Sequence, residues 1–145
     1  MDEGKTISDL VPAAKGPKVY AGGCHCGAVR FEAEMDLTAG TGKCNCSICC
    51  KTNFWGAIVK PDKFAVLQGE DELTNYRFNT KTMQHLFCKH CGIRSFGKGD
   101  LPQLGGAYIS VNINCLDEHI DPESVPVRWF DGRHDNWMGT APPRP

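Results

Sequence analysis

The stretch Cys44-Asn45-Cys46-Ser47-Ile48-Cys49-Cys50 holds four of the nine cysteines of this 145-residue chain. Its first, third and sixth residues have the C-x-C-x-x-C spacing that is typical of a metal-binding turn. Two shorter stretches contain further cysteine pairs, Cys24-His25-Cys26 upstream and Cys88-Lys89-His90-Cys91 downstream. Seven ordered thiols predict two zinc ions, one with four ligands and one with three.

The two flanking pairs are two-ligand units, so their simplest joint product is a closed four-cysteine site. Its ligands would be Cys24, Cys26, Cys88 and Cys91, and each pair is followed directly by a glycine. Glycine tolerates the unusual dihedral angles of such a turn and lets backbone amides approach the sulfurs. Because the pairs are far apart in sequence, this predicted site would close a long loop, which is where a structural metal stabilises most.

The central stretch then supplies a second site from Cys44, Cys46 and Cys49. Structural zinc sites have four ligands, so three thiolates predict an open fourth position for water or substrate. Thiolates donate electron density to the ion, so such a zinc acidifies water less than a three-histidine zinc does. It is better suited to a soft sulfur ligand. This reasoning points to a substrate that contains a thiol or thioether.

Several other assignments of the cysteines stay open at this stage. Cys50 can complete the central site as a fourth ligand, or the central stretch can share ligands with the Cys88 pair and leave the first pair spare. A pair of adjacent thiols, Cys49 and Cys50, also allows a redox sensor. An odd count of nine argues against a pure disulfide framework. Cys115 is interpreted as a small buried hydrophobic residue.

Apolar residues recur in short runs that are interrupted by glycine and proline. Residues 28–35 alternate between apolar and polar side chains, as a half-buried strand does. No segment of ten residues shows a helical stripe, and short helical turns are expected only at 46–52 and after Pro122. This pattern predicts a mainly β, sandwich-like fold. The expected strands lie at 19–21, 28–35, 54–59, 64–67, 73–78, 83–88, 93–96, 107–111 and 125–130, with Pro126 limiting the last one to an edge.

Length and charge limit the possible functions. The chain has the length of one domain, with 16 basic against 17 acidic residues and a formal charge of −1. This balance gives no reason to expect a nucleic-acid partner. No secretory signal or apolar run of membrane-spanning length is visible, so we expect no membrane association and a cytoplasmic location, where thiols stay reduced.

Three spaced motifs carry a resemblance to a known family: Gly23–Phe31 (GCHCGAVRF), Cys44–Cys49 (CNCSIC) and Phe87–Ile93 (FCKHCGI). The sequence resembles the glutathione-dependent formaldehyde-activating family, which also includes centromere-protein-V-like proteins. The resemblance continues through Tyr76-Arg77-Phe78, Val111-Asn112, Cys115-Leu116 and Phe130-Asp131-Gly132. It covers about residues 19–137, so we expect a single zinc domain over 19–137, a flexible lead-in over 1–18 and a Pro-rich tail over 138–145.

The resemblance implies an Mss4-like, β-rich fold with two zinc ions, one structural and one catalytic. By position, the four flanking cysteines match the structural site, and Cys44, Cys46 and Cys49 match the catalytic one. The implied activity is that of a carbon–sulfur lyase, which joins formaldehyde and glutathione as S-hydroxymethylglutathione or reverses this reaction. The alternative is a non-catalytic zinc module that binds protein or nucleic acid. Neither the oligomeric state nor the true thiol substrate follows from the sequence.

Basic residues near the metal ligands are candidates for substrate binding, because glutathione carries two carboxylates. Lys51 and Arg94 are the nearest in sequence, and Arg94 is also a candidate catalytic residue. His85 is a candidate proton shuttle. All three can equally be ordinary residues, Lys51 and Arg94 as solvated surface charges and His85 as a hydrogen-bonded, half-buried histidine. The sequence departs from the family pattern here: Cys50 stands where a basic residue is common, and Arg94-Ser95-Phe96 replaces a His-Pro-Phe-like segment.

Overall fold

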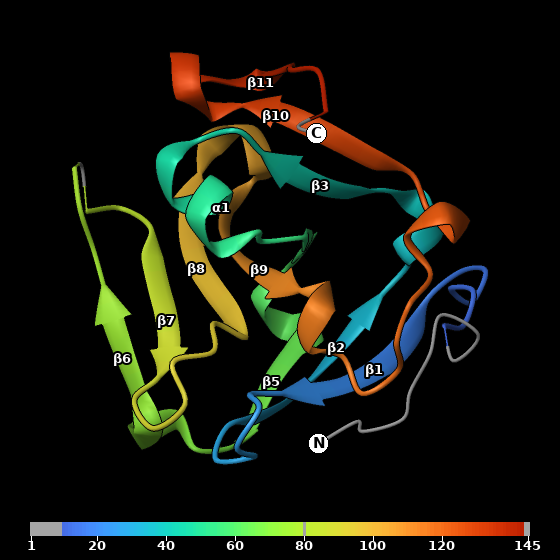
Figure 1. The fold of residues 1–145 in the computed structure, drawn as a ribbon, viewed down its shortest axis with the longest axis vertical. Helices are drawn as coiled ribbons and strands as arrows, with labels where there is room; N and C mark the ends of the chain where they lie inside the picture. The colour runs from blue at the N-terminus through green and yellow to red at the C-terminus, as the bar shows by residue number, and fades with distance from the viewer. Residues whose placement is uncertain (1–9, 80, 144–145) are drawn as a thin grey trace.

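Two β-sheets make up the computed structural model, which describes residues 10–79 and 81–143 (Figure 1). The smaller sheet is antiparallel and has the order β1-β2-β5. Its strands are β1 (Lys18–Gly23), β2 (Arg30–Met35) and β5 (Phe64–Gln68). The described chain is mainly β, which confirms the predicted fold class.

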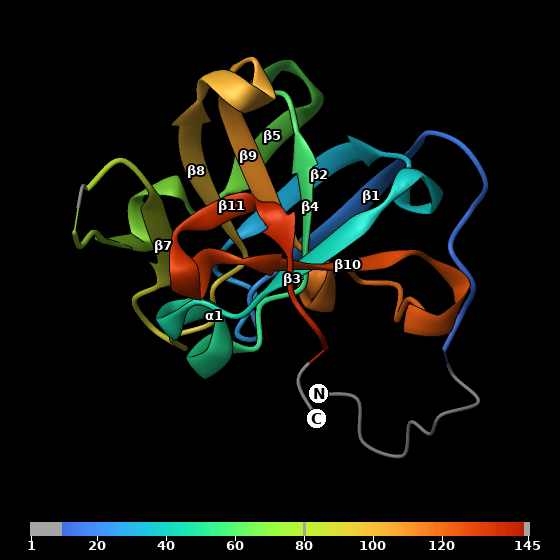
Figure 2. The ribbon, with the colours of Figure 1, turned by 90° about the horizontal axis from the view of Figure 1, so that it is seen from above.

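The larger sheet contains eight strands within the described residues, and Figure 2 shows how it curves around the smaller one. Neighbouring strands are antiparallel except β10 and β3, which run parallel. In sheet order the strands are β11 (Asn136–Thr140), β10 (Val127–Asp131), β3 (Thr41–Cys44), β4 (Gly56–Val59), β9 (Gly106–Asn112), β8 (Phe96–Leu101), β7 (Gln84–Cys88) and β6 (Leu73–Tyr76).

An apolar core lies between the two sheets and follows from the alternation in the sequence. On β2, Phe31 is buried whereas its neighbour Glu32 is exposed. The Phe31 ring stacks on Phe64 of β5 with 5.5 Å between centroids, and Phe64 meets Phe96 of β8 at 4.7 Å. Aromatic rings bury large apolar areas, so this trio contributes strongly to holding the two sheets together.

Helical structure is limited to short pieces. One α-helix, α1 (Ser47–Thr52), starts after Cys46 and ends at Asn53, whose φ of 51° is left-handed. The helix α1 lies within the helical turn that was predicted at 46–52. No helix of the described chain has the length and apolar character needed to cross a bilayer. The 3-10 turns are η2 (Leu37–Ala39), η3 (Pro61–Lys63), η4 (Glu70–Glu72), η5 (Pro102–Leu104), η6 (Ile113–Cys115), η7 (Pro122–Ser124) and η8 (Gly132–His134).

The N-terminal segment contacts the rest of the chain at Val11 and Ala13. The Val11 amide donates a hydrogen bond to the His119 carbonyl at 2.8 Å, and the Ala13 amide donates to the Ser124 hydroxyl at 3.0 Å. The flexible lead-in expected over 1–18 includes residues 1–9, which lie outside the described residues. The division into lead-in, domain and tail stays a prediction.

The expectation that Pro126 limits its strand to an edge is wrong. The strand β10 has β3 on one side and β11 on the other. Proline cannot donate a hydrogen bond, but β10 begins one residue later at Val127, so no ladder bond is lost. The Pro126 carbonyl instead accepts hydrogen bonds from the amide and the hydroxyl of Thr41.

We expect Gly69→Ala to destabilise the fold much more than Gly16→Ala. Both glycines have left-handed φ angles, +83° and +80°, so both substitutions cost about 1–2 kcal/mol in backbone conformation. A Cβ at residue 69 would lie 2.0 Å from the Ala28 carbonyl oxygen, whereas nothing lies within 4 Å at residue 16. The clash should add about 1–3 kcal/mol, measurable by urea unfolding. Equal losses for the two variants would contradict this account.

Candidate metal centres

Four thiols meet where the two sheets approach each other. Cys24 and Cys26 lie in the connection from β1 to β2, Cys88 ends β7, and Cys91 lies in the turn after it. Their Sγ atoms all lie within 4.8 Å of one another, and the Cys24–Cys26 and Cys26–Cys88 distances are both 3.7 Å. A tetrahedron with Zn–S bonds of about 2.3 Å has edges of about 3.8 Å, so these thiols fit zinc.

Backbone amides support the sulfurs of this four-cysteine group. The Val29 amide donates to Cys24 Sγ at 3.2 Å, and the His90 amide donates to Cys88 Sγ at 3.4 Å. Such hydrogen bonds favour the thiolate, which is the form that binds metal. Each cysteine pair therefore has an amide donor within its own turn.

Three further thiols form a second group at the end of β3. Cys44 ends that strand, Cys46 precedes α1 and Cys49 lies within it, and their Sγ atoms lie within 4.8 Å of one another. Hydrogen bonds from the Cys46 and Cys49 thiols lower the pKa of Cys44, whereas hydrogen bonds to Cys44 and Cys46 raise the pKa of Cys49. One thiolate is therefore favoured in this group, and three soft sulfur donors suit zinc.

The two groups of thiols that the structure brings together are the groups that were predicted. Cys50 belongs to neither, because its thiol donates to the Asn45 carbonyl at 3.1 Å. Cys115 lies apart from both groups and is half-buried, with its thiol 3.7 Å from the Arg94 carbonyl. All nine cysteines are free of disulfide bonds.

Arg94 connects the two groups. Its backbone follows the second cysteine pair, and its carbonyl accepts a hydrogen bond from Asn112 Nδ2 at 2.8 Å. Its guanidinium lies over the Phe54 ring, 4.1 Å from the centroid, and forms a hydrogen bond with the Cys49 thiol. Burial lowers the pKa of Arg94, whereas the nearby Cys49 and Cys46 raise it. Its Nε and Nη1 atoms are buried without a hydrogen-bond partner among the described residues, so a cation with spare donors stands beside the three-cysteine group.

His85 lies on β7 close enough to Arg94 for the charge of the guanidinium to act on it. Only 6% of its surface is exposed, and its Nδ1 lies 3.0 Å from the Tyr76 carbonyl. Because a carbonyl can only accept, Nδ1 carries the proton and Nε2 of the neutral ring keeps its lone pair. Burial lowers the pKa of His85, the hydrogen bond to Tyr76 opposes this shift, and the Arg94 charge adds to it.

The other candidate substrate-binding residue, Lys51, is exposed in the last turn of α1, and its role stays a prediction. Two further residues lie near Arg94. Phe54 covers the guanidinium, and Tyr108 of β9 interacts electrostatically with both Arg94 and Cys49. The sequence reasoning did not place Tyr108 at the site, because its position depends on the pairing of β9 with β8 and β4, which no local sequence signal reveals.

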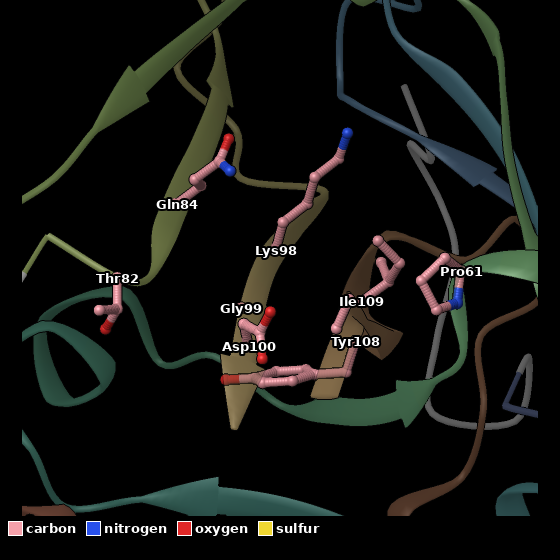
Figure 3. A pocket seen from close by; sticks show the side chains of 9 residues that line it. Pro61, Thr82, Gln84, Lys98, Gly99, Asp100, Tyr108 and Ile109 are labelled. Atoms are coloured by element: carbon pink, nitrogen blue, oxygen red, sulfur yellow. The ribbon is translucent and has the colours of Figure 1, made fainter. Parts of the chain in front are cut away.

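A shallow groove of about 300 Å³ lies on the larger sheet (Figure 3). No cysteine lines it, and its polar side chains include Gln84, Lys98 and Asp100. Lys98 extends away from Asp100 and from the Tyr108 ring in Figure 3. The groove therefore gathers no cluster of like charges or metal ligands. Its lining residues are Pro61, Thr82, Gln84, Lys98, Gly99, Asp100, Ala107, Tyr108 and Ile109.

We expect the two thiol groups to respond differently to loss of one ligand. Cys88→Ser should remove the metal that joins segments 62 residues apart and lower the free energy of unfolding by several kcal/mol. Cys46→Ser should leave a folded protein with one zinc, because its group lies within one short segment. Native mass spectrometry and thermal unfolding measure both effects. A similar loss of stability and of both metals in the two variants would contradict the division.

We expect His85 to make the fold less stable as the pH falls below about 6.5. The unfolded histidine has an ordinary pKa of about 6.5, whereas the folded pKa is lowered. Between these two values the unfolded chain binds more protons, so the free energy of unfolding decreases with falling pH. His85→Gln should therefore gain stability relative to the wild type from pH 7 to pH 5 in urea unfolding. A constant difference across this range would contradict the burial of the ring.

Two comparisons with known proteins agree with this geometry. The crystal structure of a Rhodobacter sphaeroides protein shares 32% sequence identity with this chain and superimposes with a TM-score of 0.62. The alignment covers 74% of this chain and 98% of that chain. The family model described as "Glutathione-dependent formaldehyde-activating enzyme" matches residues 19–130, which include both cysteine groups. The chain belongs to the glutathione-dependent formaldehyde-activating enzyme family.

Proposed function

We propose that this protein is a zinc-dependent carbon–sulfur lyase that acts on a thiol adduct such as S-hydroxymethylglutathione. The observation that carries the proposal is the three-cysteine group with the Arg94 guanidinium beside it. Cys44, Cys46 and Cys49 would hold zinc, which would supply a soft Lewis acid suited to a sulfur-containing substrate. The four-cysteine group would hold a second, structural ion.

Arg94 binds an anionic group of the substrate. One part of its guanidinium contacts Cys49, and its Nε and Nη1 donors have no partner among the described residues, so each can donate to an anionic oxygen. Hydrogen bonds between a guanidinium and a carboxylate are charge-assisted and therefore stronger than neutral ones. The Phe54 ring shields one face of the guanidinium from water, which strengthens the attraction. Exposed Lys51 on α1 can receive a second carboxylate, as glutathione provides.

His85 moves the proton. In adduct formation the thiol proton passes to His85 Nε2, and the sulfur forms a bond to the formaldehyde carbon. The carbonyl oxygen of formaldehyde then takes the proton from Nε2 and becomes the hydroxyl of the adduct. Cleavage runs through the same steps in reverse. A neutral ring with a fixed tautomer is needed for this role, and the Tyr76 carbonyl supplies it.

A cytoplasmic location fits this proposal, because nine free cysteines and a thiol substrate both need reducing surroundings. The proposed substrate, a thiol or its formaldehyde adduct, is a small molecule. With a formal charge of −1, the chain offers little general attraction for nucleic acid.

Exchange NMR of glutathione–formaldehyde mixtures tests the reaction directly. The wild-type protein with two zinc ions should accelerate exchange, and His85→Gln should lower the rate by about 10²–10⁴-fold, the usual contribution of general acid–base catalysis. His119→Gln is the matched control, because His119 lies in the segment that pairs with Val11. No acceleration by the two-zinc protein would contradict the lyase and favour the non-catalytic binding module.

Arg94→Gln tests the anion site separately. It should raise KM for adducts of carboxylate-bearing thiols by about 10–100-fold, since a charge-assisted hydrogen bond contributes about 1.5–3 kcal/mol. For the formaldehyde adduct of 2-mercaptoethanol, which has no carboxylate, KM should change less than about twofold. Equal effects on both adducts would show that Arg94 acts on the metal site or the fold and not on the carboxylate.

A further inference from the structure

Asn45 lies between Cys44 and Cys46 and ties their loop to the C-terminal hairpin, which we define as β10, η8 and β11. Its side-chain Nδ2 donates to Asp131 Oδ1 at 2.7 Å. Its Oδ1 accepts from the Arg133 amide at 2.8 Å. Both ends of the Asn45 side-chain amide are therefore occupied by the same hairpin, which fixes the orientation of this side chain.

The backbone of the loop continues this connection. Strand β3 pairs with β10 up to the partners Cys44 and Phe130, and the Asn45 amide then donates to the Phe130 carbonyl at 3.2 Å. The Gly132 amide forms a hydrogen bond with the Cys44 thiol itself. The hairpin thus contacts a ligand sulfur as well as the residue that follows it. Figure 1 shows β10 and β11 directly beside β3, with α1 below.

Asp131 is held as a carboxylate, the form that accepts the hydrogen bond from Asn45. Its carboxylate accepts from Asn45 and also from His134 Nδ1, at 2.8 and 2.9 Å to its two oxygens. These two partners lower the pKa of Asp131, with the Asn45 hydrogen bond as the larger cause. The side chain is only 17% exposed, so water competes weakly for it. An ionised acceptor makes a stronger hydrogen bond than a neutral one.

The three-cysteine group receives little support from core packing. The helix α1, which carries Cys49, has six residues and buries none of them, so core packing does not fix its position. Both groups have an amide donor within their own turns, since the Cys46 amide donates to Cys44 Sγ at 3.4 Å. In the four-cysteine group, however, Cys24 and Cys88 belong to the buried core. The second group depends on a connection to another part of the chain.

We propose that Asn45 and Asp131 form a clamp that positions Cys44, Cys46 and Cys49 for metal binding, so that the C-terminal hairpin is part of the metal site. The inference rests on the proposed function only in taking these three thiols as metal ligands. Asn45 and Asp131 are positioning residues, because neither contacts the substrate or the metal. Outer partners of this kind contribute about 10–100-fold to metal affinity.

An exchange of the two side chains tests the clamp. Asn45→Asp keeps the shape of the residue but replaces the donor with a second carboxylate, so the contact with Asp131 becomes repulsive. The double variant Asn45→Asp with Asp131→Asn restores one donor and one acceptor in reversed positions. Titration with Co²⁺ follows the thiolate charge-transfer band, and comparison with Cys46→Ser identifies the part that belongs to the three-cysteine group. Native mass spectrometry with zinc counts the ions.

Asn45→Asp should weaken Co²⁺ binding at the three-cysteine group by about 10–100-fold and leave the four-cysteine group unchanged. The double variant should return to within about threefold of the wild type. Asp62→Asn, an isosteric charge change at exposed η3, is the control and should change neither affinity. Asp131→Ala, which leaves the ligand segment intact, should reproduce the selective loss and decides the question if Asn45→Asp does not fold.

The clamp is contradicted if Asn45→Asp binds Co²⁺ at both groups within twofold of the wild type, if the double variant fails to recover, or if both groups weaken equally. Wild-type protein that binds no Co²⁺ at the three-cysteine group would also overturn it. Two bound ions without lyase activity would instead contradict the proposed reaction and leave the clamp standing. The two failures are therefore distinguishable.

Discussion

The contact between the two cysteine pairs, Cys24–Cys26 and Cys88–Cys91, is the constraint on which the rest of the structure depends. One pair belongs to the small sheet and the other to the large one, so the four thiols join the sheets at one end. The phenylalanine cluster of Phe31, Phe64 and Phe96 packs the space between the sheets. A metal here would fix the relative position of two layers that consist of short strands, each marginal alone.

Arg94 connects the four-cysteine group with the proposed chemistry. Its backbone leaves the four-cysteine group, and its guanidinium reaches the three-cysteine group between Phe54 and the bare backbone of Gly97. A side chain at Gly97 would collide with Met83 and approach Arg94 Nη2 to 3.2 Å. The absence of a side chain at Gly97 therefore leaves space for the Arg94 guanidinium. The position of Arg94 depends on the four-cysteine group, because its backbone follows Cys91 closely in the sequence.

The cysteine spacing predicted both thiol groups, because each ligand pair or triplet lies within one tight turn. Alternation predicted β2, and the strands expected at 73–78 and 83–88 overlap β6 and β7, which pair as neighbours. The parallel pairing of β3 with β10 was not predictable, since it joins residues 86 apart without a local signal, as Thr41 and Val127 show. The contact of Arg94 with Cys49 depends on other long-range pairings, those of β9 with β8 and β4. The sequence could therefore only nominate Arg94 by its nearness to Cys91.

The C-terminal hairpin supplies residues that position the three-cysteine group but supplies none of its thiols. The family model ends at residue 130, immediately before Asp131 and Arg133, which hold Asn45. The seven thiols lie within the residues that the family model matches, whereas Asp131 and Arg133 follow its last residue, although the motif Phe130-Asp131-Gly132 also carries the family resemblance. Because α1 buries no residue, small changes in this hairpin can shift Cys46 and Cys49 without replacing a ligand. Under the proposed clamp, a change in this hairpin would alter the three-cysteine group while the four-cysteine group stays fixed.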